Sequence, residues 1–374
     1  MSQPETHEQP DVRKRPYTLS IPAFLQEELD KTDWEELDTD TGDGGELPIF
    51  INGLLAEEDP ELGDHCFDVL DEEIGQAVYK ATYKVGEILA TLLPRYTPES
   101  EVHTRVVKFL FLIMSRLTIR KGKDAYENLT TKLQASIPAF YQRAAHPDDK
   151  FALEGIYLLL HAGRTAPETV VFLWKIYNNT ALSTFKRSYA LFTLAILYVE
   201  TDQSTTLITE FSAIWESTEE KLLRLILAAH LVMAAEGESK TPWIMELIEV
   251  FIHPAPLKQD FFKLNPYTYS YHIEEYILGV LRYIDADKQE HKIAPVLAML
   301  PEANILTLTT LFDALFSILF WQRASLENIT PTRKQALLLS ADIVDKNPGV
   351  VNHAEIFRKY QLPYDATQLR QLAG

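Results

Sequence analysis

Three strongly apolar segments recur at nearly equal spacing in the middle of the chain, and this spacing limits the possible folds more than any other feature. They begin at Asp148, Ser183 and Ser217, about 35 residues apart. Apolar residues occupy nearly every position around each predicted helix, so each must be covered on several sides. A fixed period of this length is typical of stacked helical repeats. We therefore expect helical hairpins packed one against the next from Pro147 to Met233.

The segments between these helices have a different pattern. Residues 170–177 and 207–215 each place their large apolar side chains on one stripe, as an outer helix with one solvent-facing side does. Each repeat would then pair an outer amphipathic helix with an inner buried one. Two kinds of signal mark the expected helix starts, namely capping-box spacing and a first-turn proline: Thr165-x-x-Glu168, Ser217-x-x-Glu220, Pro167 and Pro242.

Length and composition indicate a large core and a cytoplasmic protein. The chain has 374 residues, 46% of them hydrophobic, enough for one long repeat domain or two lobes. Cys66 is the one cysteine, so no internal disulfide can form, which fits a reducing compartment. The amino terminus lacks the apolar run of a secretory signal, and no apolar stretch approaches the ~18–20 residues that span a bilayer. We expect no association with membranes.

The negative charge is concentrated at one end of the chain. Residues 1–75 contain 22 acidic and 4 basic residues, a net charge of −18, whereas the other 299 residues contain 32 acidic and 31 basic, a net charge of −1. An acidic block repels nucleic acid and membrane phosphates and attracts basic proteins. The alternative interpretation is a solvated surface that only keeps the protein soluble.

Residues 1–46 are predicted to form an acidic, partly disordered extension, with disorder to about residue 16. A short helix is expected from Pro22 to about Asp30. Trp34 either docks back on the body of the protein or meets a partner. The acidic, glycine-rich stretch 38–46 departs from a calcium-binding loop at three of the required positions and is predicted to be a turn.

Residues 47–94 contain the most distinctive motifs. Two predicted helices flank the turn Asp59-Pro-Glu-Leu62, and Gln76-Ala-Val-Tyr-Lys-Ala-Thr82 leads into a third. This order resembles the opening of bacterial HEAT-like repeat proteins, in which a similar "DPEV" turn precedes the second helix and a "HQGxVYxAT" segment follows. Here Gly75 stands near the position of the family's histidine, and Ala77 replaces its glycine. The resemblance extends over about residues 47–235, and the close Tyr360–Asp365 also resembles the carboxyl ends of such proteins.

The resemblance implies an all-α fold, a HEAT-like α-α superhelix of stacked hairpins that binds proteins. Residues 47–374 would form this solenoid, with regular repeats to about 252, an aromatic insertion at about 260–272 and a carboxyl-terminal helical cap from 273. Many bacterial members of the family are immunity proteins that neutralise polymorphic toxins. The resemblance therefore implies a non-enzymatic protein that binds and occludes a basic toxin domain.

Motifs for chemistry are missing from the sequence. The ten histidines show no pair four residues apart and no His-Glu-x-x-His, and there is no nucleophile elbow or dinucleotide fingerprint. We expect no enzyme activity, no cofactor and no metal. The candidate partner-binding residues are therefore acidic and aromatic ones in the amino-terminal part of the chain and in the aromatic insertion: Trp34, Glu35, Glu36, Asp38, Glu57, Glu58, Asp59, Asp71, Glu72, Glu73, Tyr79, Tyr267, Tyr269 and Tyr271.

Two other functions stay open at this stage. A general scaffold or assembly adaptor without a toxin partner would have the same charge pattern. A HEAT-like nucleic-acid-processing enzyme would need a basic groove to neutralise phosphates, and the net charge of the chain argues against it. The sequence does not indicate the oligomeric state.

Overall fold

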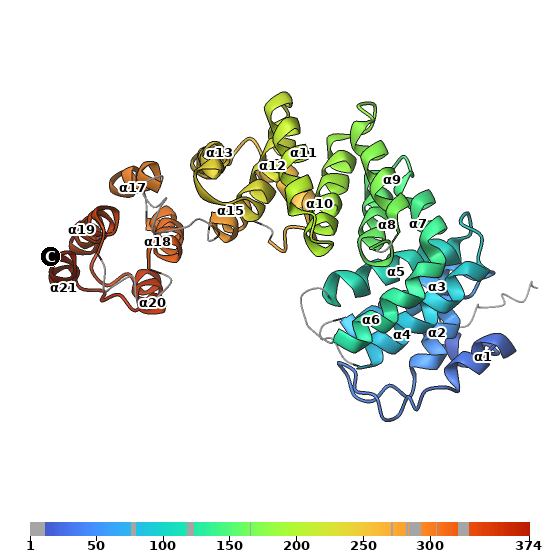
Figure 1. Cartoon of the computed structure of the whole chain (residues 1–374). Coiled ribbons are helices and arrows are strands. Elements are labelled where there is room, and N and C mark those ends of the chain that lie inside the picture. Colours follow the sequence, from blue (N-terminus) through green and yellow to red (C-terminus); the bar gives the residue numbers. More distant parts are fainter. Residues whose placement is uncertain are drawn as a thin grey trace, which may run out of the picture. The chain divides into compact units, whose positions relative to one another are not determined.

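The computed structural model describes residues 12–75, 80–117, 123–164, 166–270, 272–281, 283, 293–303, 305–320 and 329–374. Throughout these ranges the regular structure is helical, with no strand (Figure 1). The prediction of an all-α protein with many stacked helices is confirmed. The chain divides into two compact units, Met1–Thr193 and Leu194–Gly374.

The first unit contains ten helices in its described part. Consecutive helices and near neighbours pack together, in particular α2 with α3, α3 with α5, α4 with α6 and α7 with α8. Their bounds are α1 Ala23–Leu29, α2 Leu47–Leu54, α3 Pro60–Gly75, α4 Lys80–Leu92, α5 Glu101–Leu117, α6 Lys123–Leu133, α7 Ile137–Ala144, α8 Asp149–Ala162, α9 Pro167–Asn178 and the first part of α10, Thr184–Glu200.

The second unit begins within α10. Its helices also pack as neighbours, with α12 against both α11 and α13, α18 against α20 and α19 against α21. Their bounds are α11 Ser204–Ser217, α12 Lys221–Ala234, α13 Thr241–Ile252, α14 Lys258–Phe261, α15 Ile273–Leu281, α17 Ala294–Met299, α18 Ile305–Leu319, α19 Pro331–Lys346, α20 Val351–Lys359 and α21 Ala366–Ala373.

The predicted inner helices are the buried ones. In α8 every residue from Glu154 to Ala162 is buried, and α10 and α12 are buried along most of their lengths. Their starts are defined by capping side chains, since Asp148 accepts a hydrogen bond from the Lys150 N–H (2.8 Å) and Ser183 from the Lys186 N–H (3.2 Å). The prolines predicted for first turns lie in the first turns of α9 and α13.

Several predicted details differ from the structure. Ser217 does not open α12; it ends α11 and donates to the Ile214 carbonyl (3.0 Å), so the predicted capping box with Glu220 is wrong. The stripe on α9 is shifted, because Val171 is exposed while Leu173 and Ile176 are buried. A last helix, α21, follows Asp365 and was not predicted. Thr165, the other predicted capping residue, lies outside the described residues.

The segment before α2 is part of the first unit. Leu25, Leu29 and Trp34 are buried, and two short 3₁₀ turns, Val12–Lys14 and Pro16–Thr18, pack against α3 and α2. The prediction of disorder to about residue 16 therefore does not hold for residues 12–16, and residues 1–11 lie outside the described residues. The cause is a set of specific polar contacts to the α2–α3 turn, which the next section describes.

Candidate partner-binding surface

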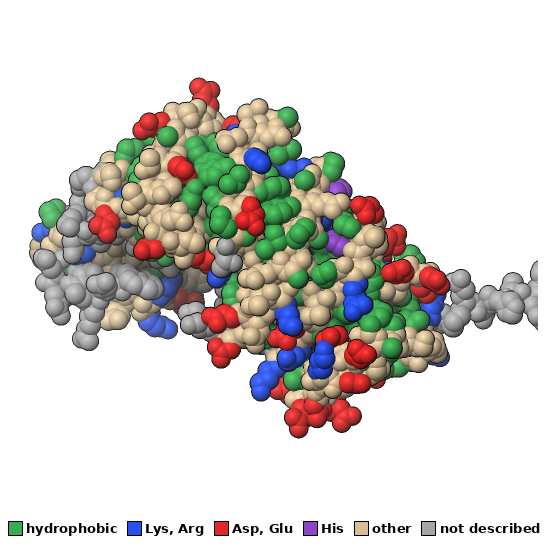
Figure 2. Space-filling model, turned by 45° about the vertical axis from the view of Figure 1, so that its right-hand side comes forward, with side chains coloured by type: hydrophobic (Ala, Val, Ile, Leu, Met, Phe, Trp, Pro, Cys, Tyr) green, Lys and Arg blue, Asp and Glu red, His purple; other side chains and the backbone are tan. Residues whose placement is uncertain are grey.

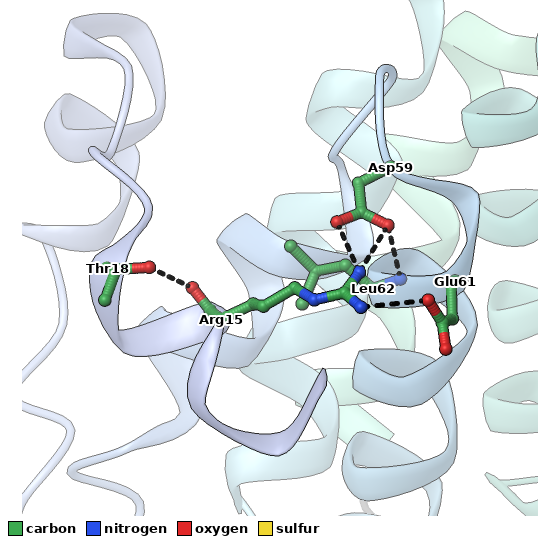
Figure 3. A network of polar contacts seen from close by, with 5 residues as sticks. All are labelled: Arg15, Thr18, Asp59, Glu61 and Leu62. Carbon is green, nitrogen blue, oxygen red and sulfur yellow. Dashed lines mark hydrogen bonds and ion pairs between the residues drawn. The ribbon is translucent and has the colours of Figure 1, made fainter. Parts of the chain in front are cut away.

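The turn between α2 and α3 is built around one carboxylate (Figure 3). Asp59 precedes α3, and its Oδ1 accepts the otherwise unpaired N–H of Leu62 (3.1 Å), as a helix N-cap does. Pro60 then occupies the first helical position, where its missing N–H costs nothing. Glu61 lies in the first turn of α3, where the helix dipole favours a negative charge.

Arg15 holds this turn from the amino-terminal side. Its Nη1 donates to both carboxylate oxygens of Asp59 (3.0 and 3.2 Å), and its Nη2 donates to Glu61 (3.0 Å). Planar guanidinium groups suit two carboxylates at once. The Leu62 N–H, and then Arg15, keep the pKa of Asp59 below its usual value. The turn therefore has a charged, geometrically defined clasp, called here the Arg15 clasp.

Further contacts fix the segment that follows Arg15. The Tyr17 hydroxyl donates to Glu46 (3.0 Å), and its ring meets Phe50 edge to face (6.1 Å between centroids). The Asn52 side chain of α2 donates to the carbonyls of Leu19 and Ser20 (3.4 and 3.5 Å). Residues 15–25, which we call the strap, are thus attached to α2 and α3 at several points.

Three of the predicted acidic residues are used inside the unit. Asp59 is part of the Arg15 clasp. Asp71 pairs with Arg116 of α5 (2.6 Å). Glu73 accepts hydrogen bonds from the hydroxyls of Thr39 and Thr41, which attach the loop before α2 to the carboxyl end of α3. These carboxylates stabilise the fold, and charge reversal there would disturb it.

Six predicted acidic residues remain exposed, and the described part of the chain gives none of them an ion pair: Glu35, Glu36, Asp38, Glu57, Glu58 and Glu72. We call this set the acidic surface. Figure 2 shows acidic side chains gathered in its lowest part, where the loop between α1 and α2 lies. Glu57 and Glu58 lie before the start of α3 and Glu72 lies near its end, roughly 20 Å away by helix geometry. The other three members lie in the loop before α2, which Thr39 and Thr41 attach to Glu73 at that end of α3.

The predicted aromatic residues have different environments. Trp34 is buried and its Nε1 donates to the Leu29 carbonyl (3.0 Å), so its indole closes the end of α1. In the second unit Tyr267 is buried beside the turn that follows α14, whereas Tyr269 is half exposed, at a positive φ of 49°. The partner roles of Trp34 and Tyr267 would need these side chains to leave the core. Tyr79 and Tyr271 lie outside the described residues.

The Arg15 clasp was not predicted. It joins residues more than 40 positions apart in the sequence. The available signal was the turn itself, because Asp59 and Glu61 flank a proline and place two carboxylates on one side of a helix start. Such a pair favours a guanidinium, but the sequence does not indicate which one.

The described residues thus form an all-helical protein with many stacked helices. No protein-family model matches the chain, and neither a curated protein nor a solved structure is found to be similar to it. Among the described residues, no three His, Cys, Asp or Glu side chains gather as a metal site would require. Across the same residues, no helix is both long and apolar enough to cross a membrane.

Proposed function

We propose that this protein is a non-enzymatic binding protein whose acidic surface recognises a basic partner protein. One observation carries the proposal: six carboxylates of the first unit are exposed and have no ion pair among the residues that the structure describes, in a region whose net charge is −18 over residues 1–75. Neighbouring acids on the same elements are neutralised by Arg15 and Arg116. The unpaired ones are therefore available for cations from outside.

Such a surface would act first on the rate of binding. Exposed carboxylates create a long-range negative potential that steers a basic protein toward them. Rigid support improves the match, because side chains that are already positioned lose less freedom on binding. The Arg15 clasp and the Glu73 contacts supply this support at both ends of α3.

The specific form of the proposal is an immunity protein that binds and occludes a basic bacterial toxin domain in the cytoplasm. The motifs at residues 47–94 resemble the opening of bacterial HEAT-like repeat proteins, many of which are immunity proteins, and this resemblance supports the specific form. The negative charge, which would complement the toxin, supports it too. A stacked-helix, HEAT-like solenoid would hold the acidic surface rigid. The near-neutral remainder of the chain, with a net charge of −1, disfavours a nucleic-acid enzyme.

Affinity capture tests the proposal. The tagged chain is used to capture proteins from its native lysate, beside a variant with Glu35, Glu36, Glu57 and Glu58 changed to Lys. A matched control carries four Glu→Lys changes at exposed positions of the second unit: Glu216, Glu219, Glu236 and Glu249. Asp59, Asp71 and Glu73 are left intact because they hold the fold.

We expect the wild type and the control to retain the same basic protein and the first variant to lose it. Co-expression should then protect cells from the toxicity of that protein. Capture of a harmless partner would point instead to an adaptor. Undiminished capture by the first variant would rule out the acidic surface as the recognition site.

A further inference from the structure

A groove of about 780 Å³ lies beside the Arg15 clasp in the first unit. One wall is the strap, and the opposite wall is the α2–α3 turn from Leu55 to Leu62. Residues 95 and 96, which follow α4, close one side. This volume is within the range of about 300–1,000 Å³ that is typical of ligand sites.

The base of the groove is apolar. Leu25, Leu55 and Leu62 are buried beneath it. Leu19 lines it from the strap with 38% of its surface exposed, and Phe24 is partly exposed at the same wall. Exposed apolar side chains beside a buried apolar base leave surface that an incoming aliphatic group can cover.

The edge of the groove is polar and negatively charged. Arg15 pairs with Asp59 and Glu61, whereas Arg95 lies over the ring of Phe24 (4.9 Å), a contact that leaves its positive charge in place. Glu57 and Glu58 are exposed at the same edge and have no such partner in the described structure. The edge therefore presents two exposed carboxylates that have no ion pair among the described residues, next to an apolar base.

We propose that this groove receives an aliphatic side chain of the basic partner while a neighbouring lysine or arginine of that partner pairs with Glu57 and Glu58. The inference rests on the proposed function for the identity of the occupant, a segment of a basic protein. It adds a defined recognition subsite to a general electrostatic attraction. Apolar contact supplies the affinity here, and the charges supply orientation.

Binding in this groove should require the Arg15 clasp, whereas simple attraction of cations should not. Without the clasp the strap would keep its contacts to Glu46, Phe50 and Asn52. It would lose its charged contacts to the α2–α3 turn, which forms the opposite wall, so the two walls would separate more easily and the groove would change shape. The same change removes a positive charge and makes the unit more negative. Simple attraction of cations would then increase, whereas binding in the groove would decrease, so one substitution separates the two.

Fluorescence anisotropy with the full chain and two labelled peptides tests the proposal. One peptide is Gly-Lys-Leu-Leu-Lys-Arg-Gly, and the other has both leucines replaced by glycine. We expect the leucine peptide to bind roughly tenfold more tightly, because the groove removes an aliphatic side chain from water. Leu19→Ala should abolish most of the difference in affinity between the two peptides, and Arg15→Ala should weaken the binding of the leucine peptide. Leu338→Ala, which truncates an equally exposed leucine of the second unit, should change nothing.

Hydrogen exchange supplies a readout that does not depend on the variants. The leucine peptide should protect amides within residues 18–25 and 55–62 of the wild-type chain. The groove is ruled out if the two peptides bind equally, if neither binds, or if protection falls elsewhere. If the two peptides bind equally and Glu35→Lys and Glu36→Lys weaken both, the groove proposal is wrong but the acidic surface is still supported as a binding site. Retained binding by Arg15→Ala would also overturn it.

Discussion

At the scale of single residues, close helix packing depends on where glycine is placed. Gly155 of α8 lies against α7 so closely that a Cβ there would be 2.3 Å from the backbone nitrogen of Ala144. Backbone atoms cannot turn aside as a side chain can, so the two helices would have to separate. The buried pair Arg143–Glu154 crosses the same contact, with Nε to carboxylate at 3.1 Å, and burial raises the pKa of Glu154.

Gly155→Ala should lower the free energy of unfolding by more than about 2 kcal/mol, because the added methyl overpacks a helix crossing. Gly279→Ala is the matched change, since a Cβ at that position of α15 meets nothing within 4 Å. It should raise the free energy of unfolding by up to about 1 kcal/mol through helix propensity. Urea denaturation followed by circular dichroism measures both, and equal effects would refute the packing argument.

Buried histidines make stability depend on pH. Burial lowers the pKa of His230 in α12 from 6.5 to about 4. Between these values the unfolded chain binds a proton that the folded chain does not, so the free energy of unfolding decreases as the pH falls from about 6.5 to about 4. The slope from this residue is at most about 1.4 kcal/mol per pH unit.

His230→Gln should therefore reduce the slope of the free energy of unfolding against pH in this window. The reduction is at most the contribution of one proton, about 1.4 kcal/mol per pH unit. Urea denaturation at pH 7, 6 and 5 gives the slope for both chains. His161 in α8, whose pKa burial lowers to about 3, keeps a residual slope in the variant. Parallel curves for wild type and variant would show that His230 does not titrate as its burial requires.

At the scale of helical elements, arginines recur at the hairpins. Arg187 of α10 donates from Nε to the carbonyl of Tyr177 near the end of α9 (3.0 Å), and Arg224 of α12 donates to the Trp215 carbonyl of α11 (3.0 Å). Arg333 of α19 reaches the Leu319 carbonyl at the end of α18 (3.0 Å). Each cation satisfies an orphan carbonyl and complements the negative end of a helix dipole.

Arg187→Met should lower the free energy of unfolding by about 1.5–3 kcal/mol, the range of hydrogen bonds to charged groups. Arg187 is buried, so water cannot replace the lost donor. Arg358→Met removes an exposed arginine of α20 and should change stability by no more than about 0.5 kcal/mol. Thermal unfolding of the three chains tests this, and a neutral Arg187→Met would contradict the hairpin role.

The helices that could be predicted were those with both an apolar pattern and a local start signal. The starts at Asp148 and Ser183 were correct because an acid or hydroxyl preceded a long apolar run. The predicted helix start at Ser217 was wrong because α11 continues to this residue and the next apolar run begins only at Leu222. Helix α21 has a good cap, Asp365 accepting from the Gln368 N–H, but its short amphipathic sequence gave no strong periodic signal.

At the scale of the whole molecule, the excess negative charge lies in residues 1–75, whereas the rest of the chain is close to neutral. The charge imbalance of residues 1–75 could be counted directly, but not which carboxylates remain available. Asp71 and Glu73 could not be distinguished from Glu72 by sequence, because their partners are Arg116, Thr39 and Thr41, more than 30 residues away. Burial of Trp34 likewise depends on tertiary contacts.

The central claim is that the acidic surface steers a basic partner. Its most direct test is the association rate constant of the captured partner as salt rises from about 0.1 M to about 1 M, which shortens the Debye length from about 10 Å to about 3 Å. The rate constant should fall at least about tenfold for the wild-type chain. With Glu35, Glu36, Glu57 and Glu58 changed to Lys, it should start lower and vary little with salt. Equal rate constants and equal salt dependence for the two chains would contradict the account.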